Sequence, residues 1–137
     1  MKNDRNTHPK ELMTGIYWGF YGGQYDSLEK FIQEVTEYNE DLENEWNPSE
    51  TVFSCMDITV QYSYWDDEEE DEVEEDFNLT ADKQSGFTTG ELLYKIHNKV
   101  VDKLEDADNH FFEGLTLWEG ENHSNPDAPL YFINQGS

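Results

Sequence analysis

The acidic residues of this chain are concentrated in one long window that contains no basic residue. From Phe31 to Asp82 there is no Lys or Arg, whereas nineteen positions are Asp or Glu. Within this window, the tract 66–76 is acidic at every position except Val73. Runs of charge usually form solvated faces, so a fold of this sequence has to expose these carboxylates while the apolar residues between them reach a core.

Length and composition predict one small folded domain. The chain has 137 residues, and aromatic residues make up 15% of it, which supplies enough large side chains for a core. We expect residues 1–13 to be a flexible N-terminal segment and residues 14–137 to be a single domain. Cys55 is the only cysteine, and no signal sequence or membrane-length apolar stretch is present, which predicts a cytoplasmic protein.

The first half of the chain predicts a strand, a helix and a second strand. The aromatic run 14–21 is typical of a strand. Asp26 and Glu29 have the spacing of a capping box, which predicts that a helix begins there. Strict alternation of apolar and polar residues over 56–64 then predicts the second strand. The apolar stripe of the helix is expected to consist of Leu28, Phe31, Ile32, Val35, Tyr38 and Leu42.

The second half repeats this outline. The tract 66–76 is predicted as the tip of a hairpin, with a returning strand near 77–79. Thr88 and Glu91 form a second capping box and predict a helix to about Ala107. Its apolar stripe is expected to contain Leu92, Leu93, Ile96, Val100 and Leu104.

Two last strands are predicted at 111–118 and 130–133, on either side of a polar loop. The element order is then β-α-β-β-α-β-β. We predict an α+β fold, a two-layer sandwich in which two helices lie on one face of a mostly antiparallel sheet. Phe31, Val35 and Ile96 are expected to be buried between the layers, together with Ile32 and Val100.

The concentration of acid has three interpretations. General solvation is one, because many charge runs have no other role. Adaptation to high salt is another, but it would spread acid evenly, and the clustering and the eleven Asn residues argue against it. Recognition of a cationic surface is the third, because a net charge of -24 repels nucleic acid and anionic membranes and attracts basic proteins.

Catalytic and metal-binding patterns are weak in this chain. Four scattered His residues and one Cys lack the fixed spacing of metal ligands. The segment that starts at Asp76 begins like an EF-hand loop, but Ala81 and Phe87 occupy the positions that need Gly and the bidentate Glu. Cys55 lies in an apparent strand, and no His has a sequence reason to lie beside it. We therefore predict no catalytic residue, no metal ligand, no cofactor and no enzymatic activity.

Large aromatic residues run directly into the acidic tract. Alternation assigns Tyr62 and Tyr64 to the core. Trp65 stands at the end of the predicted strand beside the charges, and tryptophan often supplies much of the binding energy of a protein interface. We therefore predict Trp65 as an interface anchor.

Three segments of the C-terminal part, Phe87–Asn98, His110–Leu115 and Tyr131–Ser137, together resemble small bacterial immunity proteins of polymorphic toxin systems. The resemblance is one of general pattern and contains no diagnostic catalytic motif. It implies a cytoplasmic protein that binds and blocks a cognate toxin, often a nuclease. No site residue is carried over from it.

Charge and resemblance lead to the same functional hypothesis. We predict an acidic, protein-binding inhibitor of the immunity type that covers the nucleic-acid-binding cleft of a basic partner, above all a nuclease toxin. The tract 66–76 is expected to contribute less per charge than the first helix, because a mobile loop loses entropy on binding. The predicted partner-binding residues are Glu34, Glu37, Asp41 and Glu45 on the first helix, and Trp65, Asp66, Asp67, Glu68, Glu69 and Glu70 at the hairpin.

Three alternative hypotheses stay open. A phage-type anti-defence protein would imitate nucleic acid by the same physics, so the sequence does not separate it from an immunity protein. A non-catalytic accessory domain of a larger complex would need no charge recognition. A small enzyme or metal-binding domain is the third, and the motif search gives it little support.

Overall fold

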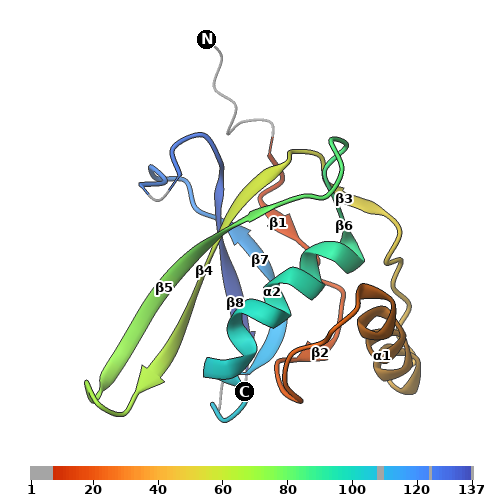
Figure 1. Ribbon diagram of the computed structural model, residues 1–137, viewed down its shortest axis with the longest axis horizontal. Coiled ribbons are helices and arrows are strands. Elements are labelled where there is room, and N and C mark those ends of the chain that lie inside the picture. Colours follow the sequence, from red (N-terminus) through yellow and green to blue (C-terminus); the bar gives the residue numbers. More distant parts are fainter. Residues whose placement is uncertain (1–7, 108–109, 124, 137) are drawn as a thin grey trace.

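Residues 8–107, 110–123 and 125–136 are described by a computed structural model, which has two helices and a mostly antiparallel sheet (Figure 1). The predicted α+β class is therefore confirmed. In chain order the elements are β1 (Glu11–Leu12), β2 (Trp18–Gly19), α1 (Leu28–Asp41), β3 (Thr51–Phe53), β4 (Asp57–Asp66), β5 (Asp71–Thr80), β6 (Phe87–Thr88), α2 (Thr89–Leu104), β7 (Phe111–Leu117) and β8 (Leu130–Gly136).

The main sheet has the strand order β1-β7-β8-β4-β5, and β2 also pairs with β7. The pair β4–β8 is parallel, and the other pairs of this sheet are antiparallel. α2 crosses one face of the sheet, and α1 packs against α2 and β2 (Figure 1). β3 and β6 form a separate two-stranded ribbon, so the structure adds three short strands, β1, β3 and β6, to the predicted order.

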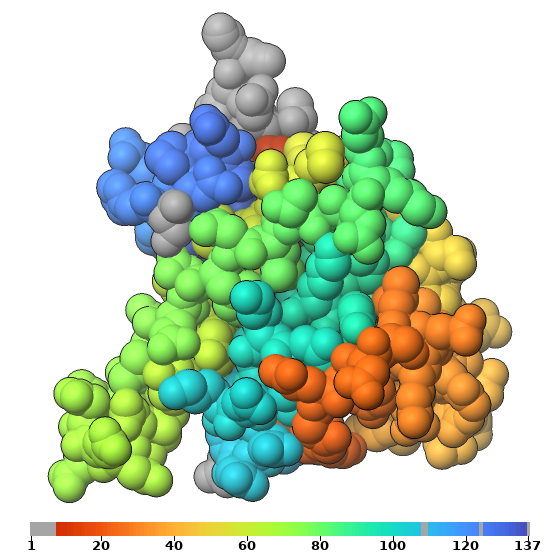
Figure 2. All heavy atoms as spheres, viewed as in Figure 1, coloured from red at the N-terminus to blue at the C-terminus, as the bar shows by residue number. Residues whose placement is uncertain are grey.

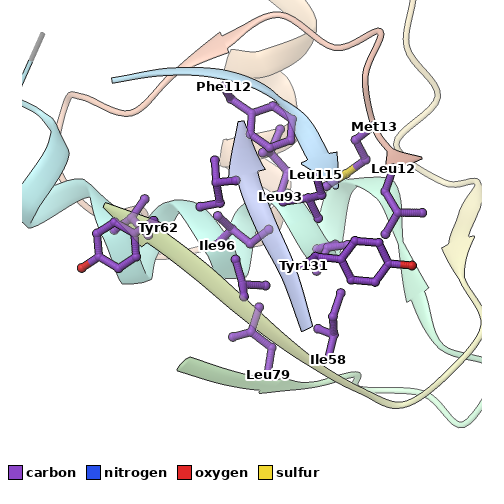
Figure 3. Close-up of a cluster of buried hydrophobic side chains, with 14 of the residues drawn as sticks. Leu12, Met13, Ile58, Tyr62, Leu79, Leu93, Ile96, Phe112, Leu115 and Tyr131 are labelled. Atoms are coloured by element: carbon purple, nitrogen blue, oxygen red, sulfur yellow. The ribbon is translucent and has the colours of Figure 1, made fainter. Parts of the chain in front are cut away.

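α2 supplies the centre of the core. The Thr88 hydroxyl oxygen accepts a hydrogen bond from the Glu91 N–H at 3.1 Å, which confirms the predicted N-cap. Leu93 and Ile96 point from α2 toward the strands, one of which carries Tyr131 (Figure 3). The predicted apolar stripe is completely buried at all five positions, namely Leu92, Leu93, Ile96, Val100 and Leu104.

α1 begins at a different cap from the predicted one. Ser27 is the N-cap, and its hydroxyl oxygen accepts a hydrogen bond from the Lys30 N–H at 3.1 Å. The prediction that Asp26 caps this helix is therefore wrong, because the residue with extended backbone next to the first turn is Ser27. Phe31 and Val35 are completely buried as predicted, whereas Ile32 is only half-buried.

The predicted strand 14–21 is reduced to the two residues of β2. The buried side-chain amide of Asn39 on α1 forms hydrogen bonds with both the backbone N–H and the backbone carbonyl of Tyr17. Its Oδ1 accepts from the Tyr17 N–H at 3.0 Å, and its Nδ2 donates to the Tyr17 carbonyl at 2.9 Å and to the Val35 carbonyl at 2.8 Å. The backbone at Tyr17 is thus paired with an amide side chain and not with a neighbouring strand.

Part of the predicted flexible segment belongs to the packed unit. Glu11–Leu12 forms β1 against β7, and Leu12 and Met13 are buried. The Tyr131 hydroxyl donates to the Pro9 carbonyl at 2.6 Å. The predicted boundary at residue 14 is therefore corrected to a position nearer the N-terminus, because two apolar residues in a polar stretch suffice to extend the sheet edge. The rest of the predicted segment, residues 1–7, lies outside the described residues.

A buried histidine joins α2 to the segment that precedes α1. His97 is completely buried among aromatic rings, and its Nδ1 accepts a hydrogen bond from the Trp18 indole N–H at 3.1 Å. Its Nε2 lies 2.8 Å from the Gly23 carbonyl oxygen, so the neutral ring carries its proton on Nε2. Burial lowers the pKa of His97, because a charged ring would lose its hydration in this aromatic cage.

We expect the protein to lose stability in mild acid through His97. Because its pKa is below 6.5 in the folded chain and near 6.5 in the unfolded chain, its contribution is complete above pH 6.5 and is lost as the pH falls below that value. Urea unfolding at about pH 7.5 and about pH 5.5 should show a larger loss for the wild type than for His97→Gln, which does not titrate in this range. Equal losses in the two proteins would contradict this role of His97.

Candidate functional site

The long hairpin β4–β5 carries most of the acidic tract. Its strands pair over ten positions, from Asp57 opposite Thr80 to Asp66 opposite Asp71, without a shift of register. A turn at 67–70 connects them. The predicted hairpin is therefore present, with its returning strand in the order that the sequence indicated.

The tip of this hairpin is shorter than predicted. Only 67–70 forms the turn, whereas 71–76 belongs to β5. The Asp66 carboxylate helps to close the turn, because its Oδ1 accepts the Glu68 N–H at 2.9 Å. The expectation that 66–76 is one mobile loop is wrong, since strand pairing orders its second half.

The two faces of the hairpin have different chemistry. In an antiparallel pair, residues directly opposite each other lie on the same face. On the outer face, Glu72 of β5 therefore stands opposite Trp65 of β4. In the same way, Glu74 stands opposite Ser63, and Asp76 stands opposite Gln61. Trp65 is 59% exposed, and all three carboxylates are exposed. We call this set the acidic hairpin face: Trp65, the tip 66–71, Glu72, Glu74 and Asp76.

The inner face is held to the body by two tyrosines. Tyr62 and Tyr64 are buried as predicted, and both donate to the Glu75 carboxylate of β5, at 3.1 Å and 2.9 Å. The Lys103 ammonium of α2 lies 4.8 Å from the centre of the Tyr64 ring, which is the range of a cation–π contact. These contacts connect both strands of the hairpin to each other and to the end of α2.

Both tyrosines are kept in the protonated form. Burial, reinforced by the Glu75 carboxylate, raises the pKa of Tyr62. The hydrogen bond to Glu75 raises the pKa of Tyr64. A neutral hydroxyl is the form that can donate to a carboxylate, so the clamp persists throughout the physiological pH range.

The far half of the hairpin extends beyond its neighbouring strand. β8 pairs with β4 only at 59–61. Further along, the Gln135 side chain takes the place of a strand: its amide group accepts from the Ser63 N–H and donates to the Ser63 carbonyl, both at 2.9 Å. The tip then projects away from the body (Figure 2). The acidic hairpin face is thus presented on a projection that another protein can approach from several sides.

The predicted acidic residues of the first helix form a second, separate surface. Glu34, Glu37 and Asp41 are exposed on α1, as predicted, whereas Glu45 follows the helix, which ends at Asp41. α1 and the hairpin tip lie on opposite sides of the molecule (Figures 1 and 2). The structure therefore does not bring the two groups of predicted site residues into one site.

One lysine of α2 forms ion pairs in the described part of the chain. Between residues that the structure describes, the ion pairs at 4.0 Å or less are those of Lys95 with Asp82 and with Glu91, both at 3.0 Å. Neither Asp82 nor Glu91 belongs to the acidic hairpin face or to the acidic side of α1. With a net charge of -24, the chain as a whole has a strong negative potential.

Cys55 has a neighbour that the sequence did not indicate. The His8 Nδ1 lies 4.0 Å from the Cys55 Sγ, at the edge of a wide hollow that Met56 and His123 also line. The sequence offered no reason to expect this contact. The two residues are 47 positions apart, and no local pattern signals their contact.

Within the described ranges, no three His, Cys, Asp or Glu residues are arranged to hold a metal ion. No helix in the described part of the chain has the length and apolar character needed to cross a membrane. Comparisons with protein-family models, with curated proteins and with solved structures returned no match for this chain.

The tyrosine clamp should stabilise the hairpin measurably. Replacing Tyr62 and Tyr64 together by Phe removes two donors to the exposed Glu75 carboxylate, and a typical intramolecular hydrogen bond contributes about 0.5–1.5 kcal/mol to stability. We expect the free energy of unfolding in urea to fall by about 2 kcal/mol, with faster amide exchange at 73–75. The exposed Tyr17→Phe serves as the control. A double variant as stable as this control would show that the clamp is dispensable.

Proposed function

We propose that this protein is an inhibitor of the immunity type, which binds a basic protein partner through the acidic hairpin face and covers the partner's nucleic-acid-binding cleft. A cleft that holds phosphates is lined by Lys and Arg, and the same side chains can pair with carboxylates. The protein acts in this proposal by occupancy alone, without a catalytic step.

The arrangement of charge along β5 is the observation that carries this proposal. Alternate residues of a strand lie about 6.8 Å apart, so Glu72, Glu74 and Asp76 form one line of charge. This spacing is shorter than the Debye length of about 8 Å at physiological ionic strength, so the three charges act on a partner together. A line of negative charge on a projecting strand matches a groove that is built for a nucleic-acid strand.

The fixed geometry of the face also favours recognition over simple solvation. The carboxylates of β5 stand on a strand that is paired with β4 and joined to it by the Tyr62 and Tyr64 hydrogen bonds to Glu75, and Lys103 of α2 contacts the Tyr64 ring. A partner therefore meets charges that are already in place, and binding costs less conformational entropy than it would with a mobile loop. Solvation alone would need neither a paired strand nor a clamp.

Charge reversal tests which acidic surface binds. The proposal predicts that a neighbouring gene encodes the basic partner, so the product of that gene is the ligand, and its association is followed by surface plasmon resonance at about 50 and about 300 mM salt. We expect Glu72→Lys with Glu74→Lys to slow association by about tenfold at the lower salt concentration, because both residues face the partner.

The matched variant carries the same change of charge on α1, as Glu37→Lys with Glu40→Lys, two exposed residues outside the groove described below. It should slow association by less than about threefold, through net charge alone. A larger effect of the α1 variant would assign the site to the first helix. Association that is insensitive both to salt and to reversal on either surface would contradict the proposal.

Trp65 should act on the lifetime of the complex. Its exposed ring stands opposite Glu72 on the same face, so a partner that contacts this carboxylate also covers the indole. We expect Trp65→Ala to raise the dissociation rate by about tenfold or more and to leave the association rate nearly unchanged, because a desolvated aromatic residue holds the formed complex. Trp118→Ala, an exposed indole elsewhere, is the control. Equal dissociation rates in the two variants would exclude Trp65 as an anchor.

A further inference from the structure

An aromatic groove lies between the C-terminal end of α1 and β7. It is a hollow of about 550 Å³, within the range of ligand-binding clefts. Its lining includes Tyr17, Tyr38, Leu42, Phe111 and Glu113. β7 and β5 are separated in the sheet by β8 and β4, so this groove and the acidic hairpin face are distinct surfaces.

The fold leaves two large side chains of this groove in contact with solvent. Leu42 is 51% exposed although the sequence predicted it on the buried stripe, because α1 ends at Asp41 and Leu42 is its C-cap. Tyr17 is 50% exposed, and the buried Asn39 amide fixes its backbone. The groove is therefore preformed, with exposed apolar surface at fixed positions.

Acidic residues flank this apolar surface. Glu113 lines the groove itself, and Asp41 directly precedes Leu42. Glu34 stands one helical turn before Tyr38 and is exposed. The described lining contains no Lys or Arg. An occupant thus meets an apolar centre with the Glu113 carboxylate in its lining, and the exposed Asp41 is next in sequence to the lining residue Leu42.

We propose that this groove binds a peptide segment of a partner protein that carries one bulky apolar side chain between two arginines. The apolar side chain enters beside Leu42 and Phe111, and the guanidinium groups reach Asp41 and Glu113. Tyrosine rings at the wall also favour guanidinium, which stacks on aromatic faces. A second copy of this chain is a poor occupant, because each chain has a net charge of -24. This inference goes beyond the proposed function and does not depend on it.

Three synthetic peptides test the chemistry of the occupant. The probe is acetyl-Gly-Arg-Phe-Arg-Gly-amide, and the other two replace its Phe by Gly or both of its arginines by Glu. In ¹H–¹⁵N correlation spectra we expect the probe to shift the amide signals of Tyr17, Leu42 and Phe111. Its dissociation constant should be at least about fivefold lower than those of the other two peptides. Equal binding of the three peptides, no binding of the probe, or shifts confined to 65–76 would overturn the proposal.

Two matched variants of exposed apolar residues test whether the peptide binds in the groove. Leu42→Lys removes apolar surface from the groove and repels arginine, and it should weaken binding of the probe by about tenfold. Met56→Lys makes the same chemical change at a residue that is 37% exposed and lines a different hollow, and it should change binding by less than about twofold. The Glu72→Lys, Glu74→Lys variant should bind the probe almost as the wild type does. Equal losses in the Leu42 and Met56 variants would overturn the proposal, whatever the outcome for the hairpin.

Discussion

Repulsion among carboxylates is the constraint that the β4–β5 hairpin has to satisfy. Like charges directly opposite each other in an antiparallel pair are destabilising. The pairing avoids this along the outer face, where Glu72 and Glu74 of β5 stand opposite Trp65 and Ser63 of β4. Carboxylates meet across the strands at the tip, where Asp66 stands opposite Asp71 and solvent screening is greatest. Acid on one strand and uncharged residues on the other thus allow a strand of low intrinsic propensity to form.

The placement of carboxylates on the two faces of the hairpin also determines which face can bind a partner. On the inner face, the Glu75 carboxylate accepts hydrogen bonds from two tyrosine hydroxyls of β4, and Lys103 of α2 contacts the ring of one of them, Tyr64. On the outer face, the remaining carboxylates keep a fixed spacing on a projecting support (Figure 2). Preorganised charge is effective in association, because the partner has no loop to order before the charges meet. The proposed inhibitory role follows from this combination of rigidity and charge.

Periodicity accounts for the part of the fold that could be predicted. Strict alternation over 56–64 indicated β4 and correctly assigned Tyr62 and Tyr64 to the core, and the Thr88 cap indicated α2. Side-chain hydrogen bonds between residues far apart in the sequence account for most of the fold that could not be predicted. The Asn39 side chain bonds the backbone of Tyr17, 22 residues away, so Tyr17 does not pair with a neighbouring strand and the predicted aromatic strand is reduced to β2. No local pattern in the sequence reveals this contact. The paired strand 71–76 was missed because a run of acid has poor strand propensity, and its order comes from the residues opposite. The separation of the two acidic surfaces depends on the packing of α1 against α2 and β2, and the groove beside Leu42 depends on where α1 ends.

Hydrogen exchange of the complex tests the central claim most directly. The protein is labelled alone and when saturated with the basic partner that the proposed function requires, and amide protection is compared along the chain. The account predicts that new protection is concentrated at 65–76, on the far half of the hairpin, where amides that face the free edge of β5 exchange readily in the isolated protein. Protection that leaves 65–76 unchanged and appears on α1 or elsewhere would contradict recognition through the acidic hairpin face.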